Sequence, residues 1–121
     1  MELQRLDARL TVCKVSDVRE IDLDADIFFV GRTDEELSLV CRTEDAPART
    51  IAREDGWRGF RIRGVLDFSL VGVLARLSGI LASQGIGLFA VSTFNTDYIL
   101  VREGQFEQAL AALAAGGYDI L

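Results

Sequence analysis

Residues 64–102 carry the clearest hydrophobic pattern in the chain. Their apolar stripe consists of Leu70, Val73, Leu74, Leu77, Ile80 and Leu81. Intervals of three and four residues place such side chains on one face of a helix. Ser69 has the side chain of a helix N-cap, and Gly85 followed by Ile86 fits a glycine C-cap with its hydrophobic contact. The pattern therefore predicts an amphipathic helix between Ser69 and Gly85.

Strands and a second helix are predicted on both sides of this helix. Residues 57–66 alternate apolar side chains with arginines, which is typical of a strand with one buried face. Residues 89–101 form two apolar runs around the polar turn 95–97, and this arrangement predicts a β-hairpin. A shorter helix is expected over residues 105–115 and a last strand over residues 118–121. The predicted order is β-α-β-β-α-β.

The first half of the chain repeats this pattern in a weaker form. Residues 28–40 match residues 89–101 at an offset of 61, with a polar turn between two apolar runs in each segment. A strand is expected over residues 9–15, an acid-rich and poor helix over 16–26, and a second helix over 45–55.

Together the two halves predict an α+β protein of two ferredoxin-like βαββαβ units in tandem. Right-handed crossovers place both helices of such a unit on one face of an antiparallel sheet. The predicted boundaries are residues 1–56 for a degenerate first unit and 57–121 for the second.

The two cysteines of the chain lie on strands that this topology makes neighbours. Cys13 and Cys41 are therefore either a redox pair or two small apolar side chains in one core. The second interpretation is favoured, because a chain without a CxxC motif or histidine shows neither a redox dithiol motif nor a zinc site.

Charge and composition exclude several classes of partner. Thirteen basic and 19 acidic residues give a net charge of −6, which opposes binding to nucleic acid or to an anionic membrane. No apolar segment approaches the roughly 20 residues that span a bilayer, and the first ten residues lack the apolar core of a signal peptide. A cytoplasmic protein is expected.

The arginines at positions 58, 61 and 63 are interpreted as one solvated or interfacial strand face.

The segment LDFSLVGVLARLSGILASQGIGLFAVSTFNTDYILV (residues 66–101) resembles the ACT domain family, the small regulatory modules of amino acid metabolism. It is most similar to the stand-alone tandem ACT proteins of bacteria and to the repeats of eukaryotic cytosolic arginine sensors. The resemblance implies a regulatory protein that holds a small molecule between ACT units, and it places the ligand loop on residues 67–73 and a second edge on residues 93–97.

This loop has the chemistry that a free amino acid requires. Unpaired N–H groups at the start of a helix, expected near residues 71–73, bind a carboxylate, and Asp67 or Asp97 binds the ammonium group. Gly72 permits close approach of a ligand. The predicted ligand-binding residues are Asp67, Ser69, Leu70, Val71, Gly72, Val73, Thr93, Asn95, Thr96 and Asp97.

Three functions compete at this point. The first is a regulatory protein that binds a small molecule, an amino acid by expectation, and forms a homodimer. The second is a ligand-free interaction or dimerisation module that uses sheet-edge pairing. An enzyme is disfavoured, because the sequence has no histidine, GxSxG motif or P-loop; no catalytic residue, cofactor or metal site is predicted.

Overall fold

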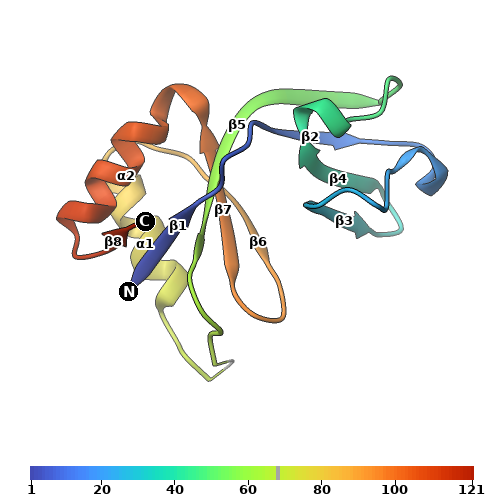
Figure 1. Cartoon of the computed structure of the whole chain (residues 1–121). Helices are drawn as coiled ribbons and strands as arrows, with labels where there is room; N and C mark the ends of the chain where they lie inside the picture. The colour runs from blue at the N-terminus through green and yellow to red at the C-terminus, as the bar shows by residue number, and fades with distance from the viewer. Residues whose placement is uncertain (68) are drawn as a thin grey trace. The chain divides into compact units, whose positions relative to one another are not determined.

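The computed structural model describes residues 1–67 and 69–121 and divides the chain into two compact units (Figure 1). The helical unit consists of Met1–Asp7 and Arg58–Leu121, and the strand unit consists of Ala8–Trp57. The predicted boundary assigned residues 1–7 to the first unit, whereas these residues pack with the second half of the chain. No helix in the described part of the chain is long and apolar enough to cross a membrane.

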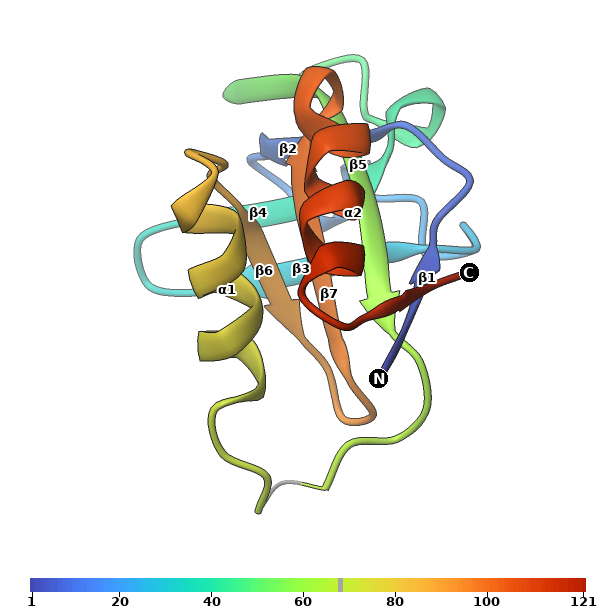
Figure 2. The same ribbon diagram turned by 90° about the vertical axis from the view of Figure 1, so that its left-hand side faces the viewer.

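The helical unit is a sheet covered by two helices. Its strands are β1 (Glu2–Arg5), the C-terminal part of β5 (Ala52–Ile62), β6 (Phe89–Ser92), β7 (Asp97–Arg102) and β8 (Asp119–Ile120). Figure 2 shows α1 (Val73–Ser83) and α2 (Phe106–Ala115) together on one face of this sheet. The α+β class and the shared face of the two helices are confirmed.

The N-terminal strand changes the predicted topology of this unit. A βαββαβ unit formed by residues 57–121 alone would pair its first and last strands. In the structure β1 lies between them, antiparallel to β5 and parallel to β8, with Leu3 opposite both Ile62 and Ile120. The sheet is therefore mixed rather than antiparallel throughout.

The core of the helical unit lies between the sheet and the helices. Its fully buried side chains include Leu3 and Phe60 from the strands, Leu77 from α1 and Phe106 from α2. Leu77 and Leu81 of the predicted stripe are buried in α1, whereas Leu70 precedes the helix and is exposed. Helix α1 ends as expected, because Gly85 adopts φ +71° and the Ile86 N–H donates to the Leu81 carbonyl.

The strand unit has four paired strands and no α-helix in its described residues. Its strands are β2 (Leu10–Lys14), β3 (Phe28–Arg32), β4 (Leu37–Arg42) and the N-terminal part of β5, in the order β3-β4-β2-β5. The helix predicted over residues 16–26 is wrong, since only the 3-10 turn η1 (Val18–Glu20) forms there. The helix predicted over residues 45–55 is also wrong, because the 3-10 turn η2 (Thr43–Asp45) ends at the first residue of this segment and β5 begins within it.

Local hydrogen bonds explain the missing first helix. The Asp17 carboxylate accepts from the Arg19 N–H, and the Asp22 carboxylate accepts from the Asp24 N–H. Such bonds offer the backbone an alternative to helical pairing. The acidic residues therefore favour turns in this segment.

The two hairpins are equivalent at an offset of 60 rather than 61. Each has a four-residue turn that begins with threonine: the Thr33 N–H donates to the Glu36 carbonyl, and the Thr93 N–H donates to the Thr96 carbonyl. Arg32 lies opposite Leu37, and Ser92 lies opposite Asp97. The predicted match at an offset of 61 is therefore out of register by one residue, and a slip of one residue moves every side chain to the other face of the sheet.

The cysteines lie in the core of the strand unit. Cys13 and Cys41 are free thiols in one buried cluster on the adjacent strands β2 and β4. Burial raises the pKa of Cys13 above its ordinary value and raises the pKa of Cys41 to about 12. A thiol that holds its proton at neutral pH is a poor nucleophile, so these findings support the interpretation as apolar core residues.

Candidate functional site

A cavity of about 350 Å³ opens between the β5–α1 loop and the turn that joins β6 to β7. The loop and the turn lie at the same end of the helical unit in both ribbon views (Figures 1 and 2). The residues that line the cavity are Leu66, Asp67, Leu70, Gly72, Val73, Leu74, Ala75, Ser92, Thr93, Phe94, Asn95, Thr96 and Asp97. The volume is at the lower end of the range of small-molecule sites.

Hydrogen bonds hold the two sides of the cavity together. The Leu66 N–H donates to the Asn95 carbonyl at 2.7 Å, which joins the loop to the turn. The buried Thr96 hydroxyl donates to the Ile62 carbonyl at 2.7 Å, which joins the turn to the end of β5. Thr93 closes the turn, because its hydroxyl donates to the Thr96 carbonyl. The rim is thus supported by the sheet.

Helix α1 begins later than predicted. Its N-cap is Gly72, which has φ +79°, a left-handed conformation that favours glycine. Ser69 is not the cap, because its N–H and hydroxyl both donate to the Asp67 carboxylate at 2.8 Å. No side chain of the described residues caps the helix. Because the N-cap is Gly72, the N–H groups without a partner within the helix are those of Val73, Leu74 and Ala75 rather than of residues 71–73.

Two carboxylates line the cavity beside this helix start. The hydrogen bonds from Ser69 lower the pKa of Asp67, so its carboxylate stays ionised at neutral pH. The stabilisation from these bonds is present above the unfolded pKa of about 4 and is lost as the pH falls through the lower folded pKa. Asp97 accepts from the Ser92 hydroxyl at 2.6 Å. No basic side chain is part of the described lining.

The structure brings together most of the predicted site residues. Those that line the cavity are Asp67, Leu70, Gly72, Val73, Thr93, Asn95, Thr96 and Asp97. Ser69 and Val71 belong to the same loop but are not part of the described lining, and Val71 is exposed to 91%. Phe68, within the predicted loop 67–73, lies outside the described residues.

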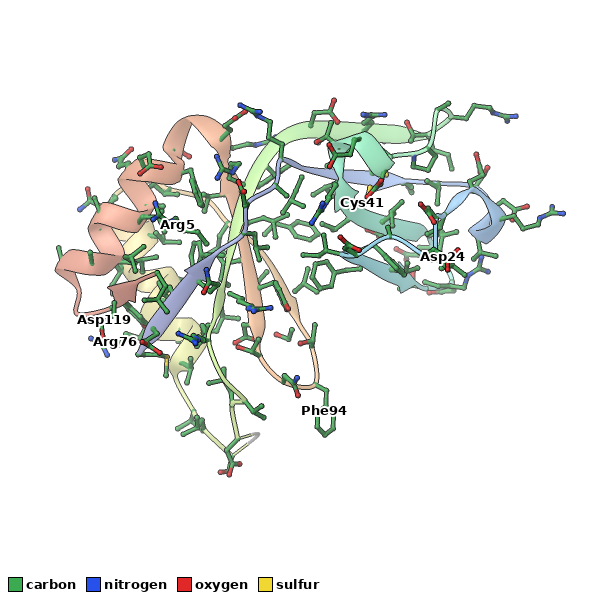
Figure 3. The ribbon with its side chains drawn as sticks, in the orientation of Figure 1. Arg5, Asp24, Cys41, Arg76, Phe94 and Asp119 are labelled. Atoms are coloured by element: carbon green, nitrogen blue, oxygen red, sulfur yellow. The ribbon has the colours of Figure 1, made fainter. Side chains whose placement is uncertain are left out.

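Sequence reasoning missed five lining residues: Leu66, Leu74, Ala75, Ser92 and Phe94. Figure 3 shows Phe94 projecting from the tip of the β6–β7 hairpin, and its side chain is 77% exposed. An aromatic residue between Thr93 and Asn95 in a polar turn is the signal that identifies it in the sequence.

Thr96→Val should lower the free energy of unfolding of the helical unit by about 1–3 kcal/mol, because the buried Ile62 carbonyl loses its hydroxyl donor. Urea denaturation followed by circular dichroism at 222 nm measures the loss. Thr93→Val is the matched control, since its hydroxyl bonds only within the turn and a smaller loss is expected. Equal losses for the two variants would show that the Thr96 bond to β5 has no special weight.

Comparison with known proteins identifies the fold and the family of this chain. The family model of the ACT domain matches residues 52–115. The chain belongs to the ACT domain family. No curated protein matches it at a significant level.

Solved structures with this ACT architecture include two bacterial proteins of similar length. The crystal structure of protein Atu0741 from Agrobacterium tumefaciens is 32% identical, with a TM-score of 0.86 over 99% of this chain and 91% of that chain. Protein VC0802 from Vibrio cholerae, described as a possible transport protein, is 23% identical, with a TM-score of 0.75 over 93% of this chain and 86% of that chain.

The ACT fold of this chain is also shared with a regulatory subunit. The ligand-free regulatory subunit of aspartate kinase from Thermus thermophilus is 13% identical, with a TM-score of 0.62 over 95% of this chain and 96% of that chain. Membership of the ACT domain family supports a regulatory, ligand-binding role in general.

Proposed function

We propose that this chain is a regulatory ACT protein that binds a free amino acid in the cavity between the β5–α1 loop and the β6–β7 turn. The observation that carries the proposal is the juxtaposition of an uncapped helix start with two carboxylates in one cavity. The N–H groups of Val73, Leu74 and Ala75 bind the ligand carboxylate, and Asp67 and Asp97 bind its ammonium group.

The charges of the lining narrow the class of amino acid. Asp67 and Asp97 repel a second carboxylate on the ligand, and no lysine or arginine of the described lining compensates for it. The apolar side chains of Leu66, Leu70 and Leu74 suit an aliphatic stem. We therefore expect ligands with apolar or cationic side chains to bind more tightly than aspartate or glutamate.

The rim of the cavity supports ligand binding at a homodimer interface. Four large apolar side chains near the opening are exposed: Val65 to 72%, Leu70 to 52%, Val71 to 91% and Phe94 to 77%. Contact with a second copy would remove this apolar surface from water and close the cavity around a ligand. A dimer that forms or changes on ligand binding would give the protein a regulatory output.

Thermal denaturation with each of the twenty amino acids tests the proposal. A ligand at a hundredfold excess over its Kd should stabilise the helical unit by about 2.7 kcal/mol. Asp97→Asn should weaken binding about tenfold or more, since a charge-assisted hydrogen bond is lost, while asparagine still accepts from Ser92. Asp119→Asn, at an exposed position of β8 away from the cavity, is the control that should leave affinity unchanged.

The competing function is a ligand-free dimerisation module that uses strand pairing. Strand β6 favours it, because the described pairings of β6 involve β7 on one side only. Light scattering after size-exclusion chromatography separates the two functions. A dimer that no amino acid stabilises or alters would support the interaction module and contradict the sensor.

A further inference from the structure

A second cavity of the helical unit lies where β1 ends and α2 begins. Its volume is about 270 Å³, and it shares no lining residue with the cavity at the β5–α1 loop. The lining residues are Arg5, Leu6, Asp7, Arg58, Phe106 and Glu107. Two arginines and two acidic residues therefore line one small space.

Arg58 is held in place by the core. The sequence grouped it with Arg61 and Arg63 on one face, but alternation along β5 gives Arg58 the face of the buried Phe60. Its guanidinium carbon lies 4.5 Å from the ring centroid of Phe106, which is itself buried. The Arg58 Nε is buried and donates to no acceptor in the described part of the chain. Stacking thus orients the planar guanidinium beside the cavity and leaves its buried Nε–H without a partner in the described part of the chain.

Arg5 is positioned by the end of the chain. Its backbone N–H and its Nε both donate to the Leu121 carbonyl, at 3.2 and 3.3 Å. Figure 3 shows the Arg5 side chain on the side of β1 that carries α2. Although Asp7 and Glu107 share the cavity, the described residues show no ion pair between either carboxylate and Arg5 or Arg58.

We propose that this cavity is a second binding site, which takes a small zwitterion. The ligand carboxylate accepts hydrogen bonds from Arg58 and Arg5, and the ligand ammonium group lies beside Asp7 and Glu107. Two carboxylates in the lining repel a simple anion, and two guanidinium groups repel a simple cation. A molecule that carries both a carboxylate and an ammonium group can bind the two arginines and the two acidic residues at once. This site involves other residues than the proposed amino acid site and stands independently of it.

Titration with L-alanine, followed by ¹H–¹⁵N NMR that includes the arginine Nε–H signals, tests this site. Acetate and methylammonium are titrated separately as probes of each charge alone. We expect saturable shifts of the Arg58 Nε–H and of the Glu107 amide with L-alanine, and little shift with either fragment. Amides of Gly72 and Thr96 report the loop cavity in the same spectra, so failure of one site is distinguishable from failure of the other.

Variants assign the shifts to the cavity. Arg58→Gln should raise the half-saturating L-alanine concentration at Glu107 about tenfold or more, because a charged donor is removed. Asp7→Asn, at an exposed position, should also raise it, whereas Arg61→Gln on the opposite face of β5 should not. Absence of saturable shifts at Arg58 and Glu107, an acetate response equal to that of L-alanine, or equal effects of Arg58→Gln and Arg61→Gln would each overturn the proposal.

Discussion

Leu3→Ala should lower the free energy of unfolding of the helical unit by about 2–5 kcal/mol, the range for deletion of a buried leucine side chain. Leu3 is fully buried, and it is paired with Ile62 on one side and Ile120 on the other. The lost side chain leaves a cavity at the centre of the sheet, between the two strands that an isolated βαββαβ unit would pair directly. The loss should be measured by urea denaturation at 222 nm, because the α-helices of the described residues lie in this unit.

Gln4→Ala provides the matched control for Leu3→Ala. Gln4 is on the same short strand but outside the buried core, and a change within about 0.5 kcal/mol is expected. Trp57 is the single tryptophan and belongs to the strand unit, so its fluorescence follows the other unit in the same titration. If Leu3→Ala and Gln4→Ala unfold at the same urea concentration, β1 is not an integral part of the helical unit.

The place of β1 shows where sequence reasoning failed. Four residues with one buried leucine carry too short a pattern to identify a strand, and no local feature indicates pairing with a segment more than fifty positions away. By contrast, α1, α2 and the two hairpins were predicted because apolar periodicity, a glycine C-cap and threonine-containing turns are local features. The false helix over residues 16–26 arose where acidic side chains bond to the backbone, and the one over residues 45–55 arose where β5 begins.

The candidate site, like the fold, was predicted in outline but not in detail. The resemblance to ACT domains grouped the loop and the turn, and residues of both line one cavity of the structure. It did not predict that Gly72 begins α1 at a positive φ angle, and this moves the available N–H groups by two residues along the chain. The cavity at Arg58 was missed because alternating arginines were assigned to one face, although positions 58 and 61 differ by an odd number.

Phe106→Ala should lower the free energy of unfolding by about 3–5 kcal/mol, as expected when a buried phenylalanine side chain is deleted. Phe106 is 2% exposed, begins α2 and packs in the core with Phe60 and Leu110. The change also removes the ring on which the Arg58 guanidinium stacks. The measurement is urea denaturation of the ligand-free protein at 222 nm.

Phe94→Ala is the control for the same chemical change at an exposed position. The Phe94 side chain is 77% exposed at the tip of the β6–β7 hairpin, so its removal should change the free energy of unfolding by no more than about 0.5 kcal/mol. The two variants thus compare the same chemical change in the buried core and at an exposed turn. A loss below about 1 kcal/mol for Phe106→Ala would contradict the burial of Phe106 in the core between α2 and the sheet. Truncation of an exposed side chain normally changes the free energy of unfolding little. An equal loss for Phe94→Ala and Phe106→Ala would therefore show that the β6–β7 turn contributes as much stability as the core.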